Sequence, residues 1–171
     1  MSLNYNVTED ALWVMAFAEM AATQDGRGAA KPVDLLLGLM LIGDPVFKPE
    51  VPCLGGALLR ASCAAPDDLP TLHDMGWSEL PERPSFGGRL APGITALLDD
   101  ATVLSRSLGA HYIGSEHLLI SLVADSFDDD VDAWLTGAEL TESAVLRTWV
   151  ALLLRAQSPE FGSDPRPETD A

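Results

Sequence analysis

The sequence predicts an all-α protein, a tandem pseudo-twofold repeat of two four-helix motifs with about eight helices in all. Three observations lead to this fold class. Apolar residues recur at spacings of three and four in several segments, which is the pattern of amphipathic helices. The first half of the chain matches the second when it is aligned so that Ala11 falls on Ile94, an alignment called the repeat alignment below. No stretch alternates apolar and polar residues regularly enough to form a β-strand.

The second half contains the clearest helical segments. The apolar stripe from Ile94 to Leu108 predicts an amphipathic helix. Pro92 suits its first turn, because the N–H that proline lacks would be unpaired there, and Gly109 ends the helix. Ser115 is the expected N-cap of a second helix. The remaining two helices are predicted over Asp129–Leu135 and Thr141–Ala156.

The internal repeat assigns corresponding elements to the first half. The segment Leu35–Met40 falls on Leu118–Val123, and about seven extra residues follow around Gly43–Pro52 before the match resumes. The matched positions of the first helices are Ala11, Val14, Met15, Ala18 and Gly26 on Ile94, Leu97, Leu98, Ala101 and Gly109. The repeated unit is therefore a group of helices joined by short connections.

These matches divide the chain into one domain and a tail. Residues 1–156 are predicted to form the domain, with repeat one at 7–75, a linker at 76–90 and repeat two at 91–156. The linker is predicted because glycines and prolines are mixed with charges there without sustained periodicity. Residues 157–171 carry too little apolar surface to order themselves and are predicted to be a disordered tail.

Composition excludes several classes of function. The 171 residues include 26 acidic and 10 basic side chains, which gives a net charge of −16. Such a chain is repelled by nucleic-acid phosphates and anionic lipids, so neither nucleic acid nor a membrane is an expected partner. No apolar run approaches the roughly 20 residues that span a bilayer. Two cysteines and the lack of a signal-peptide pattern predict a cytoplasmic protein with reduced thiols.

A motif in the second half resembles a known family. The run Gly109-Ala110-His111-Tyr112-Ile113-Gly114-Ser115-Glu116-His117-Leu118-Leu119 is similar to the Gly-His-x-Tyr-Ile-Gly-Thr-Glu-His-Leu-Leu signature of the N-terminal domain of Clp chaperone ATPases. The first repeat has Val7-Thr8-Glu9 where that family has Phe-Thr-Glu. The resemblance extends from Val7 to Ala156 and implies the Clp N-terminal domain fold.

The resemblance also implies a function. In the Clp family this domain docks adaptors and substrates for an unfolding ring, and some members recognise phosphorylated arginine. The phosphate-binding loop of the ATPase is absent from the sequence, so a stand-alone module without the motor is expected. The predicted role is non-enzymatic and needs no cofactor. Such a module would bind protein substrates, adaptors or a Clp ATPase and modulate Clp-dependent proteolysis as an adaptor or decoy. The alternative is a binding module for a small peptide or natural product in the groove between the repeats.

The predicted ligand- or protein-binding residues follow from the same resemblance. Glu116 occupies the signature position that contacts arginine phosphate in some family members, but its first-repeat counterpart is Val33, so a twin site would be half lost. The alternative is that Glu116 only favours the helix N-terminus, an effect of about 0.3–1 kcal/mol. The full set of predicted binding residues is Glu116, Ser115, Val7, Thr8 and Trp13.

The tryptophans are assigned by their place on the helical stripes. Trp13 and Phe17, four residues apart, suggest an exposed aromatic patch, where the Clp family commonly engages peptides and small molecules. Core packing of at least one of them is the main interpretation, and the exposed patch is the second. Trp134 and Trp149 lie on apolar stripes and are predicted to be core residues.

Metal and hydrolase sites are not expected. His111 and His117 are spaced unlike the ligands of zincins and have no accompanying cysteine pair. Ser115 and His117 stand two apart on a helix and point in different directions, so they do not form a nucleophile and base. The thiols of Cys53 and Cys63 have no basic neighbour in sequence and are predicted to be packing residues.

The acidic cluster that runs from Asp125 to Asp132 has two interpretations. It lacks the glycine and the closing glutamate of an EF-hand, so a calcium site is not predicted. A solvated helix start is the main interpretation, and a docking surface for a basic partner is the second.

Overall fold

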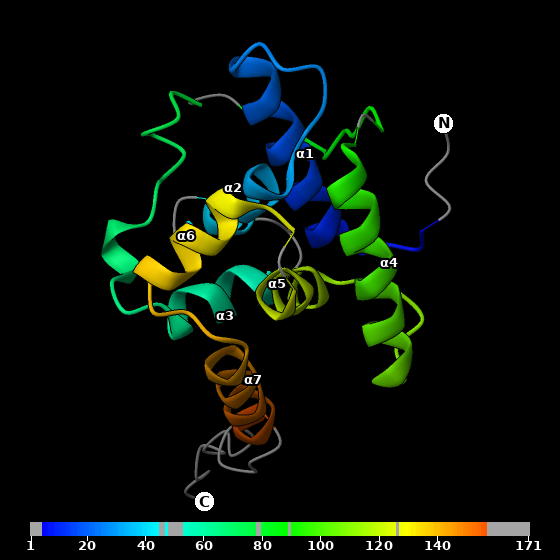
Figure 1. Cartoon of the computed structure of the whole chain (residues 1–171), viewed down its shortest axis with the longest axis vertical. Helices are drawn as coiled ribbons and strands as arrows, with labels where there is room; N and C mark the ends of the chain where they lie inside the picture. Colours follow the sequence, from blue (N-terminus) through cyan, green and yellow to red (C-terminus); the bar gives the residue numbers. More distant parts are fainter. Residues whose placement is uncertain are drawn as a thin grey trace, which may run out of the picture.

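The computed structural model describes residues 5–44, 47, 53–77, 80–88, 90–125 and 127–156. Within these residues the chain is helical, and its only β structure is two isolated bridges. The helices are α1 (Glu9–Gln24), α2 (Pro32–Ile42), α3 (Leu54–Ser62), a 3₁₀ helix (Pro66–Asp68), α4 (Pro92–Ser107), α5 (Ser115–Ala124), α6 (Asp129–Gly137) and α7 (Glu142–Ala156). The predicted all-α class is confirmed (Figure 1).

The second repeat has the four predicted helices with small shifts at their ends. Pro92 is the first residue of α4, and Gly109 follows the helix with a positive φ of 78°. The N-cap of α5 is Gly114 and not Ser115, which is the first helical residue, so that assignment was wrong by one position. The reason is that the hydroxyl of Ser115 makes contacts with other helices, as described below.

The first repeat has three α-helices among the described residues, where four were expected. After α3 the chain forms the short 3₁₀ helix and then a turn at 72–76. Pro66 begins the 3₁₀ helix and Pro70 follows it closely. Because proline removes a backbone donor and restricts the residue before it, two prolines this close prevent a longer helix. The described residues therefore hold seven α-helices, beside the eight or so that a full double repeat implies.

The two β-bridges display the pseudo-twofold relation directly. Val7 pairs in parallel with Ile113, and Ala30 pairs in parallel with Leu90. The repeat alignment carries Val7 onto Leu90 and Ala30 onto Ile113, so the same contact is made twice. One bridge joins the two repeats, and the other joins repeat one to Leu90, the linker residue directly before repeat two. The repeats are therefore interlocked rather than placed one after the other.

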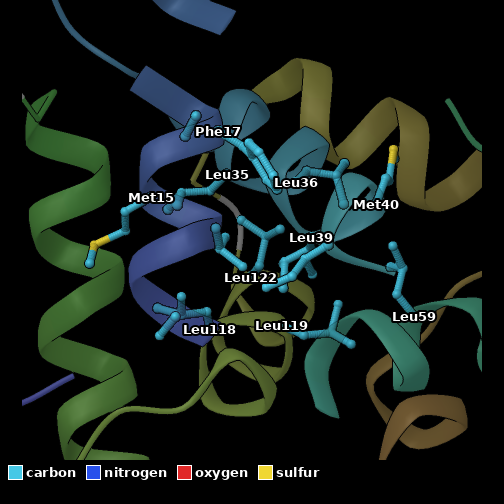
Figure 2. Close-up of a cluster of buried hydrophobic side chains, with 14 of the residues drawn as sticks. Met15, Phe17, Leu35, Leu36, Leu39, Met40, Leu59, Leu118, Leu119 and Leu122 are labelled. Carbon is cyan, nitrogen blue, oxygen red and sulfur yellow. The ribbon is translucent and has the colours of Figure 1, made fainter. Parts of the chain in front are cut away.

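The core lies where the middle helices of the two repeats meet. Figure 2 shows leucines of α2 facing leucines of α5, beside Met15 and Phe17 of α1. The facing sets are equivalent in the repeat alignment: Leu35, Leu36 and Leu39 from α2, and Leu118, Leu119 and Leu122 from α5. Full burial of one such side chain contributes roughly 1.5–3 kcal/mol. Burial of these six leucines therefore stabilises the contact between the two repeats.

Helices α1 and α2 approach each other at a glycine. A Cβ added to Gly38 would overlap the backbone carbonyl oxygen of Val14. Backbone atoms cannot move aside as a flexible side chain does, so only glycine permits this spacing. This close contact positions α1, whose N-terminus forms part of the site described below.

Trp13 and Phe17 of α1 do not form the exposed aromatic patch that was their second interpretation. Trp13 is 4% exposed and Phe17 is fully buried. Their rings lie 5.5 Å apart between centroids, and each contacts Phe47 at a steep angle. Trp77 stacks on the ring of Phe17. Trp13 and Phe17 are therefore both core residues, because Phe47 and Trp77 cover the side of α1 on which they lie.

The other two tryptophans are half-buried and pack against the core, in agreement with their predicted role. Trp149 belongs to α7, which contacts α3 and α5 and projects from one end of the molecule in Figure 1. The exposed apolar residues of α7 are Val150, Leu153 and Leu154. None of the described helices is long and apolar enough to cross a membrane. The predicted tail, residues 157–171, lies outside the described residues.

Candidate functional site

The N-termini of α1 and α5 lie side by side and bring four of the predicted binding residues together. Next to the bridge between Val7 and Ile113, the N–H of Thr8 donates to the Ile113 carbonyl oxygen at 3.0 Å. The hydroxyl of Thr8 accepts from the Ala11 N–H and caps α1. Ser115 and Glu116 begin α5 just after Ile113. Trp13, the fifth predicted residue, faces the aromatic core and is not part of this group.

Ser115 connects three helices at this point. Its hydroxyl donates to Oδ2 of Asp10 at 2.5 Å and accepts from the N–H of Gly55 at 2.8 Å. Asp10 belongs to α1 and Gly55 to α3, and both Ser115 and Asp10 are buried. A Cβ on Gly55 would overlap the Ser115 backbone, so the two helix ends are in direct contact. Ser115 therefore holds three helix ends together, with its proton directed at a carboxylate.

Asp10 accepts hydrogen bonds through both carboxylate oxygens. Thr8 donates its hydroxyl to Oδ1, while Oδ2 takes the hydroxyl and, at 3.4 Å, the backbone N–H of Ser115. A buried carboxylate is stable only when its lone pairs are satisfied in this way. Asp10 was not among the predicted site residues. Its sequence signal, an acidic residue in the first turn of a helix, is the same as that of many exposed residues.

Glu116 is the second residue of α5 and turns back toward the start of the helix. A Cβ on Gly114 would overlap the carboxyl group of Glu116, so that group lies directly over the glycine. Glu116 is 9% exposed, and burial raises the pKa of its carboxyl group. A hydrogen bond with its own backbone opposes this rise, and the charge of Asp10 adds to it. The carboxyl group therefore faces inward and is harder to ionise than a surface glutamate.

His117 caps α5 with its ring. The N–H of Gly114 donates to Nδ1 at 2.9 Å, which places the proton of a neutral imidazole on Nε2. Burial lowers the pKa of His117, although the charge of Asp10 opposes this effect. Oε1 of Glu116 lies 3.3 Å from Nδ1, but this contact is not an ion pair because Nδ1 carries no proton. The ring makes edge contacts with Tyr112 and Trp149.

The first repeat has the corresponding helix start with different chemistry. At the N-terminus of α2, the N–H of Lys31 donates to Oδ2 of Asp34 at 2.8 Å, so Asp34 caps as His117 does in the second repeat. Arg27 binds both oxygens of Asp34, at 2.5 and 2.6 Å, and also reaches Asp25 at 2.8 Å. Val33 stands at the Glu116 position and is half-buried. This end of the molecule is closed by its own ion pairs.

The contact between Ser115 and Asp10 also has an equivalent. In the repeat alignment, Pro32 stands at the position of Ser115 and Gly93 at the position of Asp10. A Cβ on Gly93 would lie 3.1 Å from Cγ of Pro32. One repeat interface thus holds a buried hydrogen bond where the other holds an apolar contact. The polar cluster of Asp10, Ser115, Glu116 and His117 is therefore particular to one end of the domain.

Known proteins share both this architecture and part of the sequence. No family model matches the chain. The chaperone protein ClpB of Propionibacterium freudenreichii subsp. shermanii is 28% identical over 132 residues, which cover 77% of this chain and 14% of ClpB. The N-terminal domain of ClpD from Arabidopsis thaliana superposes with a TM-score of 0.54 at 18% identity, over 90% of this chain and 98% of that domain. This chain has the Clp N-terminal domain fold.

A second solved structure, from an investigation of a malarial protein secretion system, matches this Clp-like domain with a TM-score of 0.55 and 16% identity. The match covers 88% of the present chain and 94% of the other. The Clp-like domain spans nearly the whole of both solved chains but only 14% of the length of ClpB. The comparison with ClpB therefore concerns one domain of that protein.

The geometry of the Clp-like domain gives Ser115 and His117 separate partners. The Ser115 hydroxyl donates to Asp10, and the acceptor nitrogen of His117 is taken by Gly114. The described residues contain no group of three or more His, Cys, Asp or Glu side chains placed to hold a metal ion. Burial, with the nearby charges of Asp10 and Glu9, raises the pKa of the Cys53 thiol to about 12. That thiol is therefore protonated at neutral pH.

The acidic segment before α6 acts as a helix start. Asp128 is the N-cap, and its Oδ1 accepts from the N–H of Asp130 at 2.9 Å. The three acidic residues in the first turn, Asp129, Asp130 and Asp132, lie where the helix dipole favours negative charge. These contacts agree with a solvated helix start, and the docking of a basic partner at this segment stays a prediction.

Proposed function

We propose that this Clp-like domain is a non-enzymatic docking module that binds protein substrates, adaptors or a Clp ATPase and modulates Clp-dependent proteolysis as an adaptor or decoy. The observation that carries the proposal is the match to the ClpD N-terminal domain over 90% of the chain, together with the ClpB similarity. The signature segment lies at the junction of α1 and α5, which makes this end of the domain the candidate docking region.

Comparison of the two repeats supports a docking surface at one end of the domain. Asp25 and Arg27 close the loop before α2, and the repeat alignment places Leu108 and Ala110 at their positions before α5. Leu108 is 50% exposed and Tyr112 is 47% exposed. One end of the molecule is thus sealed by ion pairs, while the other presents apolar side chains to solvent.

Val103, on the preceding helix α4, is a further exposed apolar residue, at 67%. We call Val103, Leu108 and Tyr112 the docking edge. Exposed apolar groups of this kind on a strongly acidic protein favour a partner segment that combines apolar and basic residues. Figure 1 shows α4 along one side of the molecule, away from α7.

The buried position of Glu116 refines the proposed role of that residue. Its carboxyl group lies over Gly114 and is 9% exposed, and Val33 replaces it in the other repeat. Recognition of a charged arginine derivative would need this carboxylate to turn outward. The proposed contact surface is therefore the docking edge and not Glu116, and Tyr112 of that edge contacts His117 of the buried cluster.

A reconstituted degradation assay tests the proposal. A Clp ATPase and its peptidase degrade an unfolded substrate such as casein with increasing amounts of the Clp-like domain. A faster rate identifies an adaptor, and a slower rate identifies a decoy. The double variant Leu108→Ser/Tyr112→Ser should lose the effect, with binding at least about tenfold weaker, because each truncated interface anchor costs about 1 kcal/mol or more and tenfold corresponds to about 1.4 kcal/mol.

The matched control is Val150→Ser/Leu153→Ser, which removes two exposed apolar side chains from α7. This variant should retain the effect of the unmodified domain. Circular dichroism must show equal helicity for both variants. An unchanged degradation rate together with no complex on size-exclusion chromatography with the ATPase or casein would contradict the proposal.

A further inference from the structure

A hollow of about 440 Å³ lies between α1 and the linker that joins the repeats. The described linker residues 80–88, here called the strap, include one lining residue and a backbone contact to α1. The lining residues are Ala16, Glu19, Met20, Thr23, Gln24, Trp77 and Ser85. This volume is within the range of small-ligand pockets in proteins. The hollow is separate from the docking edge and from the junction of α1 and α5.

Hydrogen bonds hold the walls of this hollow in place on two sides. The indole N–H of Trp77 donates to Oε1 of Gln24 at 2.8 Å, and the backbone N–H of Gly87 donates to Oε2 of Glu19 at 2.6 Å. The ring of Phe17 stacks on that of Trp77, with 5.8 Å between ring centroids and an interplanar angle of 27°. The segment predicted only as a linker is therefore hydrogen-bonded to α1 at two points, Trp77 and Gly87.

The chemistry of the lining indicates the class of ligand. Ala16, Met20 and the Trp77 ring supply an apolar surface, and Glu19 supplies the carboxylate. None of the ion pairs among the described residues includes Glu19, although its Oε2 accepts one hydrogen bond. A cation beside a tryptophan ring and a carboxylate gains from both, and the net charge of −16 attracts cations to the surface.

The second repeat lacks this arrangement. The repeat alignment places Thr102 and Val103 at the positions of Glu19 and Met20, and Val103 is 67% exposed. The hollow is formed by α1 together with Trp77 and Ser85 of the linker, so the repeated fold alone does not produce it.

We propose that the hollow under the strap is a binding site for a cationic group, an amine or guanidinium, carried on an aromatic or aliphatic body. The apolar body occupies the surface formed by Met20 and Trp77, and the cation pairs with Glu19. The proposal is independent of the docking function, since it uses a different part of the domain.

Nuclear magnetic resonance of the Trp77 indole N–H tests the site with phenethylamine as the probe. The Trp77 signal is assigned by its loss in Trp77→Phe. We expect a saturable shift of this signal that is larger than the shifts of the other three indole signals. Phenethyl alcohol, which has the same body without the charge, should bind about fivefold more weakly, which corresponds to the upper range for one partly exposed ion pair.

Two variants separate a specific site from general attraction of cations. Glu19→Gln keeps an oxygen that accepts from Gly87 and removes the charge, so it should weaken phenethylamine binding about fivefold. Glu142→Gln removes an exposed charge at the start of α7 and should leave binding unchanged. Equal affinity for phenethylamine and phenethyl alcohol, or no saturable Trp77 shift, would overturn the proposal even if Glu19→Gln were unstable.

The source of the cation is tested in the same titration. An acetylated and amidated Phe-Arg dipeptide presents the same chemistry as part of a protein chain. Tighter binding of the dipeptide supports a site for a basic protein segment, and tighter binding of phenethylamine supports a site for a free amine. Failure of both probes to shift the Trp77 signal counts against the site.

Discussion

The hydroxyl of Ser115 donates a 2.5 Å hydrogen bond to Oδ2 of Asp10, across 105 residues of sequence. This bond fastens the first helix of one repeat to the second helix of the other. The equivalent position in the opposite direction has Gly93 against Pro32, with no polar group in either side chain. The two interfaces are therefore equivalent in position but differ in the chemistry of their side chains.

Replacement of Ser115 should destabilise the fold through this contact. Ser115→Ala leaves the buried carboxylate of Asp10 and the N–H of Gly55 without their hydroxyl partner. The free energy of unfolding should fall by about 1–3 kcal/mol, because unpaired buried polar groups retain their desolvation penalty. Urea denaturation measures this change. Ser143→Ala, an exposed serine of α7, is the control, and equal stability of the two variants would refute the role of Ser115.

A methyl group at Gly38 should separate α1 from α2. The added Cβ of Gly38→Ala overlaps the Val14 carbonyl oxygen, so the helices must move apart. We expect a loss of about 1–3 kcal/mol in the free energy of unfolding, the usual range for overpacking. Gly137→Ala is the control, since no atom lies within 4 Å of its added Cβ. Thermal denaturation should show a lower midpoint for Gly38→Ala alone.

The neutral form of His117 should make stability depend on pH. Burial lowers its pKa in the folded state from the ordinary value of 6.5, so the unfolded chain binds a proton first as the pH falls. The contribution of His117 to stability is present above pH 6.5 and is lost as the pH falls through its folded pKa. His117→Gln should therefore flatten the change in unfolding free energy between about pH 7 and 5. His111→Gln, at an exposed histidine, should retain the slope of the unmodified domain.

Glu116 should affect stability with the opposite sign. Burial raises its pKa above the ordinary value of 4.5, so the ionised form is disfavoured in the folded state at neutral pH. Glu116→Gln should raise the unfolding free energy at pH 7, and this gain should disappear below pH 4.5, where glutamate is protonated in both states. Glu142→Gln should show no comparable gain. A loss of stability at pH 7 in Glu116→Gln would show that the carboxylate is satisfied as an anion.

The helices and the repeat could be predicted from the sequence because both depend on local periodicity. The apolar stripe of Ile94–Leu108 and its match to the first helix lie in the order of residues along the chain. The side of α1 that is covered could not be predicted in the same way. Trp13 and Phe17 are buried by α2, Phe47 and Trp77, which approach from distant parts of the sequence.

The candidate site was predicted in part for the same reason. Val7, Thr8, Ser115 and Glu116 were expected from the signature, and the structure places them at one junction. Asp10 was missed because its partner lies 105 residues away. The N-cap of α5 was predicted at Ser115, one residue too late, because a serine after a loop is a typical N-cap. The hydrogen bonds of the Ser115 hydroxyl to other helices leave no signal in the neighbouring sequence. Arg27 and Asp34 were missed because their pairing depends on the loop that brings them together.

The two β-bridges determine whether the halves of the chain can fold separately. Val7 pairs with Ile113 of the second repeat, and Leu90, the last linker residue, pairs with Ala30 of the first repeat, so neither repeat forms a bridge when it is alone. The facing leucines of α2 and α5 would also be exposed to water. The unit that recurs in the sequence is therefore smaller than the unit that folds, and a chain cut in the linker should recover its helices only when both fragments are mixed.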